Sequence, residues 1–216
     1  MIRRLFTPLM LALLLSACSG SPEIRPMIGG EVDDFEDGDP ISLLGMPWES
    51  IADGGETTST TFVDTQGSNQ GSVYHLTVGG TRPVGSAGNQ VSGARTRLSD
   101  GATAVDASTY DGLELSMREL QGMQGTFIVQ LATASVSDFD YYNAYVGVND
   151  EWTRYRLPFS SFKQEGFGKS VPFTAEDLTH IAVFTSGFGP YTLAVDDVRF
   201  YRAPAAPADS TQTPTP

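Results

Sequence analysis

Short runs of alternating apolar and polar residues, each bounded by Gly, Asn, Asp or Ser, recur along this chain and limit the folds open to it. Alternation of period two is typical of a half-buried β-strand, and almost no segment shows the 3.6-residue period of a helix. A single helical turn near residues 160–164 or 174–178 is compatible with this pattern. Strands are expected at TTFVDT, VYHLTV, GARTRLS, GLELSMREL, TFIVQLATA, YYNAYVGV, TRYRLPF, HIAVFTS and YTLAVDDVRFY. Many short strands without interleaved helices predict an all-β protein, an antiparallel β-sandwich of the jelly-roll type.

Side chains on a strand point alternately to its two faces, so the same runs predict which residues reach the core. In residues 112–120 the expected core residues are Leu113, Leu115 and Met117, which leaves Glu114 on the opposite face. If the strands share one sheet, its outer face combines planar hydrogen-bonding groups with aromatic rings. The residues expected on that face are Arg95, Arg97, Glu114, Gln130, Tyr141, Asn143 and Tyr145.

The N-terminus has the features of a bacterial signal segment rather than of a folded domain. Arg3 and Arg4 precede an apolar run at residues 9–15, which is too short to span a bilayer. The motif LSAC that follows resembles a lipobox, and it ends at Cys18, the only cysteine of the chain. We therefore expect a lipoprotein signal peptide at residues 1–17 and acylation of Cys18. The alternative is an ordinary signal peptide with a chance cysteine.

Acylation would place the protein in the bacterial cell envelope. Ser19 rather than Asp after the cysteine favours the outer membrane. A polar tether is expected over residues 18–30, one domain over residues 31–203, and a disordered Pro/Thr-rich tail over residues 204–216.

The formal net charge of −13 at pH 7 limits the partners of such a domain. An acidic surface repels nucleic-acid phosphates and anionic lipids. We therefore expect no nucleic-acid partner, and membrane contact only through the lipid anchor.

The chain offers little material for catalysis. His75 and His180 lie in or beside expected strands with no catalytic motif around them. The stretch GFGKS at residues 166–170 resembles the end of a P-loop but lacks the required preceding glycine and following helix. No G-x-S-x-G, H-E-x-x-H or C-x-x-C motif occurs. We expect no enzyme, and the remaining catalytic alternative is an unrecognised glycoside hydrolase with a pair of carboxylates.

Five segments in a fixed order resemble the galactose-binding-like jelly rolls: DDFEDGD, MPW, YDGLELSMRE, EWTRYRLPFSSF and YTLAVDDVRFY. Within that group the chain is most similar to family 11 carbohydrate-binding modules and to complex I intermediate-associated protein 30 (CIA30) domains, over residues 32–201. The segment at residues 152–162 is the most specific part of the likeness. The resemblance implies a structural role for it, and Trp48 is expected in the core or at its rim.

The resemblance also implies a role for the acidic segment EVDDFEDGDP at residues 31–40. In these jelly rolls the first strand lies beside the last, and a structural calcium ion commonly joins them. Glu36 and Asp197 are the expected carboxylate ligands, with Asp34 and Asp196 as substitutes. Calcium takes oxygen ligands, and without a cation acids from both chain ends would repel one another. The alternative is that these acids only protect an edge strand from pairing.

The same resemblance implies that the concave sheet face binds a polysaccharide or oligosaccharide. Aromatic rings stack on the apolar faces of pyranose rings, and planar polar groups bond to adjacent hydroxyls. Tyr145 is the strongest candidate, because family 11 modules carry a sugar-stacking tyrosine on the matching strand. Tyr141, Asn143, Gln130 and Arg97 accompany it, followed by Arg95 and Glu114. The CIA30 side of the likeness implies instead an assembly or scaffolding protein whose same face binds a protein partner.

Overall fold

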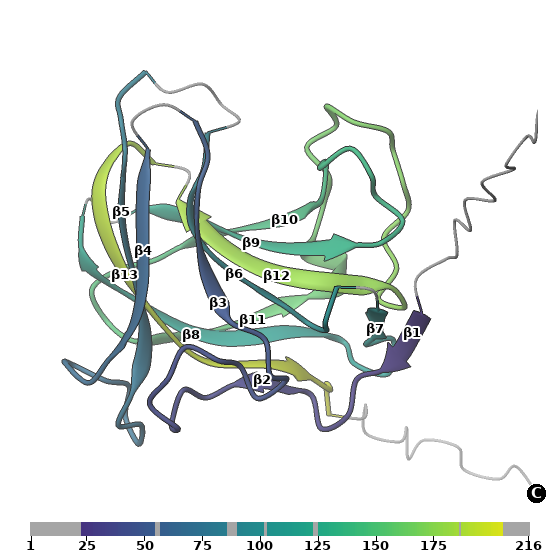
Figure 1. The fold of residues 1–216 in the computed structure, drawn as a ribbon, viewed down its shortest axis with the longest axis horizontal. Coiled ribbons are helices and arrows are strands. Elements are labelled where there is room, and N and C mark those ends of the chain that lie inside the picture. The colour runs from purple at the N-terminus through teal and green to yellow at the C-terminus, as the bar shows by residue number, and fades with distance from the viewer. Residues whose placement is uncertain are drawn as a thin grey trace, which may run out of the picture.

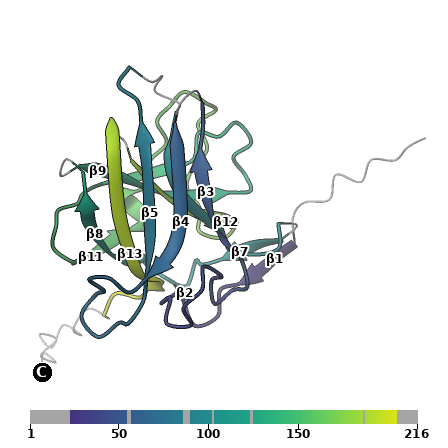
Figure 2. The same cartoon turned by 60° about the vertical axis from the view of Figure 1, so that its left-hand side comes forward.

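Two β-sheets packed face to face make up the part of the chain that the computed structural model describes (Figures 1 and 2). The described residues are 23–54, 57–85, 90–101, 103–122, 125–185 and 187–204. The expected all-β sandwich is therefore confirmed. No helix among these residues is long and apolar enough to cross a membrane.

One sheet has seven strands. Its main path is β1 (Glu23–Pro26), β7 (Thr103–Asp106), β12 (Leu178–Thr185), β6 (Ser92–Arg97) and β3 (Trp48–Ala52). In addition, β9 (Thr126–Thr133) pairs with β12, and β10 (Tyr142–Gly147) pairs with β9. The pairing of β1 with β7 is parallel, and the other pairings of this sheet are antiparallel.

The second sheet has six strands, all paired antiparallel. Its path is β11 (Thr153–Pro158), β8 (Gly112–Gln121), β13 (Gly189–Tyr201), β5 (His75–Arg82) and β4 (Thr58–Asp64). The short β2 (Glu31–Asp33) pairs with the last strand, β13, as the resemblance implied for the acidic segment. A single 3-10 turn, η1 (Phe159–Ser161), follows β11, close to one of the two expected helical turns.

All the segments expected to be strands are strands. The four strands that the alternation did not indicate are β1, β2, β3 and β7. Of these, β1 lies within residues 18–30, where we expected a polar tether. Its side chains are exposed, and it is held by backbone pairing with β7, which leaves no apolar pattern in the sequence.

The core lies between the sheets and is built from the alternate residues of the strands. Leu113, Leu115 and Met117 of β8 are fully buried, as expected. Trp48 of β3 is also buried, and its indole Nε1 donates a 2.7 Å hydrogen bond to Oδ2 of Asp33. This bond joins the first residue of β3, at one edge of the seven-stranded sheet, to β2 of the other sheet.

The loop between β4 and β5, residues 65–74, folds over the outer face of the six-stranded sheet. Nε1 of Trp152 donates to the carbonyl oxygen of Gly67 at 2.7 Å, and Nη1 of Arg118 donates to the same oxygen at 3.3 Å. His75 is fully buried in this region, with its ring 5.6 Å from that of Trp152 in an edge contact. The loop therefore covers the part of this face around His75 and Trp152.

Candidate functional site

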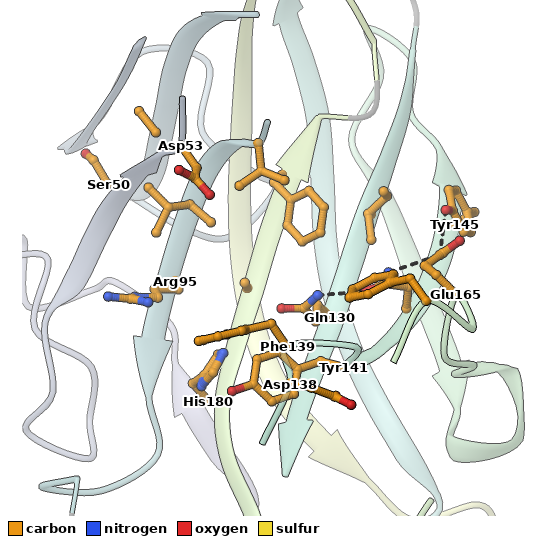
Figure 3. Close-up of a pocket in the computed structure, with 18 residues that line it drawn as sticks. Ser50, Asp53, Arg95, Gln130, Asp138, Phe139, Tyr141, Tyr145, Glu165 and His180 are labelled. Atoms are coloured by element: carbon orange, nitrogen blue, oxygen red, sulfur yellow. Dashed lines mark hydrogen bonds between the residues drawn. The ribbon is translucent and has the colours of Figure 1, made fainter. Parts of the chain in front are cut away.

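A groove of about 1150 Å³ lies on the face of the seven-stranded sheet that points away from the core (Figure 3). Strands β3, β6, β9, β10 and β12 contribute side chains to it. Two loops complete its walls, residues 134–141 and residues 163–171. In Figure 3, Arg95 stands on one side of the groove, and Tyr145 and Glu165 stand on the other.

One half of the groove is polar and connected by hydrogen bonds. Nε2 of Gln130 donates to Oδ1 of Asn143 at 2.9 Å, and Nδ2 of Asn143 donates to Oε1 of Glu165 at 3.0 Å. The hydroxyl of Tyr145 donates to the same Glu165 oxygen at 2.7 Å. This bond, together with burial, raises the pKa of Tyr145 to about 12, so the phenol stays protonated. These planar groups offer several donors and acceptors at fixed positions.

Aromatic rings stand at the end of the groove near His180. The ring of Tyr141 meets that of His180 edge-on at 5.2 Å, and Phe139 meets Tyr141 edge-on at 6.2 Å. Burial, followed by the charges of Arg95 and Arg97, lowers the pKa of His180 to about 4. The imidazole is therefore neutral at pH 7.

Two phenylalanines project from the loops at the rim. Phe139 is 73% exposed and Phe167 is 70% exposed, although large apolar side chains are normally covered. Phe139 also has a φ of 67°, in the left-handed region that residues other than glycine rarely adopt. Strained backbone of this kind persists where the surrounding structure holds it, and it concentrates at functional sites.

The two loops are joined by aspartate side chains. The buried Asp140 accepts backbone N–H bonds from Glu165 at 2.9 Å and from Gly166 and Gly168 at 3.0 Å. Oδ2 of Asp138 accepts the N–H of Lys169 at 2.6 Å. The N–H groups of Gly166, Gly168 and Lys169 in the GFGKS stretch thus donate to carboxylates, which agrees with its exclusion as a phosphate loop.

The other half of the groove is apolar. Ile128, Ala182 and Phe184 form a small cluster of buried residues, and the half-buried Ile51 and Val91 pack against it. All five line the groove. The groove therefore changes from polar to apolar along its length.

Most of the residues expected to bind a ligand meet at this groove. Those that line it are Arg95, Gln130, Tyr141, Asn143 and Tyr145. Arg97 lies in an adjoining cavity, which it shares with Arg95, Tyr141 and His180. Their role in binding stays a prediction, whereas their common location is a property of the fold.

Glu114 does not belong to this group, and the expectation that it shares a face with Gln130 and Tyr145 is wrong. It lies on β8 of the six-stranded sheet and its side chain is fully buried. It forms an ion pair with Arg156 and accepts from Nε of Arg199 at 3.0 Å. Burial opposes its ionisation, but these guanidinium groups outweigh burial and lower its pKa. Alternation assigns a side chain to one face of a strand, but it does not say which sheet the strand joins.

Sequence reasoning missed Phe139, Glu165 and Phe167, and it treated His180 only as a catalytic candidate. The first three lie in loops, where no strand alternation marks them. Gly166 and Gly168, which flank Phe167, were the available signal that this loop holds an aromatic ring outward. Gly166 has a φ of +86°, and a Cβ on Gly168 would lie 2.6 Å from the Asp138 carboxylate.

The residues expected to bind calcium lie where β2, β13 and residues 65–74 meet. Oε1 of Glu36 accepts the N–H groups of Val73 and Tyr74 at 2.8 and 3.1 Å. Oδ2 of Asp197 accepts from Nδ2 of Asn69 at 3.2 Å and faces Arg154 at 3.6 Å. Two of the candidate carboxylates are thus engaged by protein donors.

The substitutes differ from each other. Oδ1 of Asp34 accepts the N–H of Glu36 at 3.2 Å. Asp196 is fully buried, and its Oδ2 has no hydrogen-bond partner. Burial, with added repulsion from Asp197 and Glu36, raises the pKa of Asp196 to about 6. No group of three or more His, Cys, Asp or Glu side chains within the described ranges is arranged to hold a metal. The site fits calcium in part, through the unpartnered oxygen of Asp196.

Solved structures of similar fold include carbohydrate-binding modules. The family 11 module of the cellulosomal cellulase Lic26A-Cel5E of Clostridium thermocellum has a TM-score of 0.60 at 17% identity, with 82% of this chain and 96% of that chain covered. A family 11 module from Clostridium thermocellum in complex with a β-1,3-1,4-mixed-linked tetrasaccharide has a TM-score of 0.61 at 17% identity, covering 81% of this chain and 95% of that one. At these identities the likeness concerns the fold.

Sequence comparisons give a curated relative and a family. Endoglucanase 3 of Fibrobacter succinogenes is 26% identical over 178 residues, which is 74% of this chain and 25% of that protein. The chain thus spans about a quarter of the length of the curated relative it matches. Residues 54–195, most of both sheets and most of the groove, match the Complex I intermediate-associated protein 30 (CIA30) family. This match extends over more than half of the chain, which is therefore a member of the CIA30 family.

Proposed function

We propose that this protein binds a polysaccharide chain in the groove of the seven-stranded sheet and is not an enzyme. The observation that carries the proposal is the hydrogen-bonded row Gln130, Asn143, Glu165 and Tyr145 beside exposed aromatic rings. Vicinal sugar hydroxyls pair with such planar groups, and sugar ring faces stack on aromatic side chains. The fold shared with carbohydrate-binding modules supports the same function.

Two of the three carboxylates that line the groove, Asp138 and Glu165, support a role without catalysis. A glycosidase needs one carboxylic acid with a raised pKa and a second carboxylate at a set distance. The pKa of Asp138 is lowered, chiefly by the hydrogen bond from the N–H of Lys169. Glu165 is engaged by Asn143 and Tyr145 as an acceptor. The similarity to part of an endoglucanase is compatible with a binding segment of a larger enzyme.

Affinity electrophoresis tests the proposal directly. The chain from Ser19 to Pro216 would be run through gels that contain β-glucan, xylan, mannan or pectin, beside Tyr145→Ala and the control Tyr201→Ala on the other sheet. Retardation by one polysaccharide that Tyr145→Ala abolishes and Tyr201→Ala preserves is the expected result. Free migration of a folded protein in every gel would refute glycan binding. Release of reducing sugar by the wild type would refute the non-catalytic assignment.

A second candidate function follows from membership of the CIA30 family, namely assembly or scaffolding through a protein partner. The apolar half of the groove favours it, since Ile128, Ala182 and Phe184 suit an apolar side chain better than a sugar hydroxyl. This candidate predicts no sugar affinity, so the folded wild type would migrate freely in every polysaccharide gel, and Phe184→Ala would weaken capture of the protein partner. Under the glycan proposal there is no such partner to lose.

We further propose that the domain is held at the outer membrane through acylation of Cys18, which lies outside the described residues. Two or more acyl chains anchor a protein stably where a single chain does not. Metabolic labelling with palmitate followed by fractionation checks this. Label in the membrane fraction, lost in Cys18→Ser, is expected, and an unlabelled soluble protein would contradict it.

A further inference from the structure

A second cavity, of about 310 Å³, adjoins the groove at its Arg95 end. Tyr141 and His180 border both spaces, and their rings are in edge contact at 5.2 Å. Gln130, Asn143, Tyr145 and Glu165, which carry the proposed function, are absent from its lining. It is thus a separate site that a ligand in the groove could reach past Tyr141.

Positive charge gathers in this small cavity. Arg95 and Arg97 are two residues apart on β6 and share a face, and Arg97 is the cross-strand partner of His180. Arg95 pairs at 3.3 Å with Glu49, and both side chains of this pair are partly exposed. Among the described residues, Arg97 forms no ion pair.

The lining of the cavity contains no acid. None of its described residues is Asp or Glu, although the chain has 26 acidic residues against 13 Lys and Arg. The cavity is therefore a local positive site on a protein whose net charge is −13.

The remaining lining adds hydrogen-bonding groups. Thr103 and Thr179 carry hydroxyls, and Oγ1 of Thr179 lies 3.3 Å from Nδ1 of His180. The lowered pKa of His180, caused by burial and then by both arginines, agrees with two guanidinium charges close to one neutral imidazole. A guanidinium group pairs with a carboxylate or sulfate through two parallel hydrogen bonds, so an oxyanion would complete this arrangement.

We propose that this cavity is an oxyanion subsite for an acidic sugar substituent, either a uronate carboxylate or a sulfate ester. The ligand would be a largely neutral glycan with isolated acidic groups. A continuous polyanion is disfavoured because Asp53, Asp138 and Glu165 line the main groove. The glycan part of this proposal rests on the proposed function, whereas the affinity of the cavity for an oxyanion does not.

The two histidines of the chain allow a test with an internal control. His180 lines the cavity, and His75 is buried in the other sheet. Imidazole NMR signals of the chain from Ser19 would be followed at pH 7 during titration with methyl β-D-glucuronide, glucose 6-sulfate, methyl β-D-glucoside or inorganic phosphate. The glucuronide or the sulfate ester should shift the His180 signal, while the glucoside at equal concentration leaves it in place and His75 stays unmoved in all titrations.

Variants identify the site. Arg97→Ala should lower the affinity for the sugar anion that shifts the His180 signal by about tenfold. Loss of one charge-assisted hydrogen-bonded pair has an effect of this size. Arg25→Ala is the matched control, since it removes the same charge from the exposed strand β1. Arg25→Ala should be retarded in neutral polysaccharide gels as the wild type is.

The outcomes separate the two proposals. An unmoved His180 signal with both sugar anions, an equal shift with the glucoside, or a shift with phosphate alone would overturn the subsite. A shift confined to the sugar anions, with free migration in every polysaccharide gel, would keep the oxyanion site and refute the glycan groove.

Discussion

The hydroxyl of Tyr145, on β10, donates a 2.7 Å hydrogen bond to Oε1 of Glu165, which lies in the loop 20 residues further along the chain. Asn143 donates to the same oxygen at 3.0 Å. The loop that carries Glu165 therefore fixes the orientation of the Tyr145 ring, which the family resemblance makes the strongest candidate for stacking on a sugar. An ordered ring loses less conformational entropy on binding than a free one.

Two substitutions at Tyr145 separate stacking from this hydrogen bond. Tyr145→Phe keeps the ring and removes the hydroxyl, so affinity for the retarding polysaccharide should fall by about two- to tenfold. Tyr145→Ala removes the ring as well and should lower it by more than about tenfold. Isothermal titration with an oligosaccharide of that polymer measures both. Equal affinity of Tyr145→Ala and the wild type would exclude a stacking role.

Replacing Phe139 with glycine should weaken glycan binding but should not lower the stability of the fold. Its φ of 67° costs about 1–2 kcal/mol for a residue with a side chain, and Phe139→Gly removes that strain. We expect a melting temperature equal to or above that of the wild type, together with weaker glycan binding. Phe167→Ala, at the other exposed rim ring, should weaken binding without the gain in stability. A marked loss of stability in Phe139→Gly would contradict the assignment of its ring to binding.

Glu114 should determine stability rather than binding. Glu114→Gln removes the charge that accepts hydrogen bonds from the half-exposed Arg156 and Arg199, and we expect a loss of about 2 kcal/mol in the free energy of unfolding. Urea unfolding at pH 7 measures it. Glycan retardation of the folded variant should be unchanged, and a selective loss of binding would place Glu114 in the site after all.

The lowered pKa of Glu114 also predicts acid sensitivity. Its contribution to stability is fully present above the unfolded-state pKa and is lost as pH falls through the lower, folded-state value. The difference in stability between wild type and Glu114→Gln should therefore shrink as urea unfolding is repeated from pH 7 down to pH 3. A difference that stays constant would show that the carboxylate charge is not the stabilising feature.

Calcium should stabilise the domain if it binds beside Asp196. A ligand at a hundred times its dissociation constant adds about 2.7 kcal/mol to the free energy of unfolding. Thermal unfolding in excess calcium should thus occur at a higher temperature than in chelator, and Asp196→Asn should remove the difference. Identical melting curves would favour the alternative that these acids only protect an edge strand.

Local pattern was enough to predict nine of the thirteen described strands and the residues that share a face within each of those nine. Phe127, Val129 and Leu131 of β9 are buried, and Gln130, which was expected on the opposite face, lines the groove. The same rule placed Glu114 correctly on the face of β8 away from the core. It failed only in assuming that β8 and β9 belong to one sheet.

The sequence by itself determined the β-sandwich, the core residues of the predicted strands and the groove residues Arg95, Gln130, Tyr141, Asn143 and Tyr145, because period-two alternation is a property of neighbouring residues. Only the tertiary structure decided which strands pair, and therefore which outward-facing side chains lie together on one sheet. It also brought Asp140 against the backbone of Gly166 and Gly168, which places Glu165 beside Tyr145. Such contacts join residues far apart in the chain, and no local periodicity encodes them.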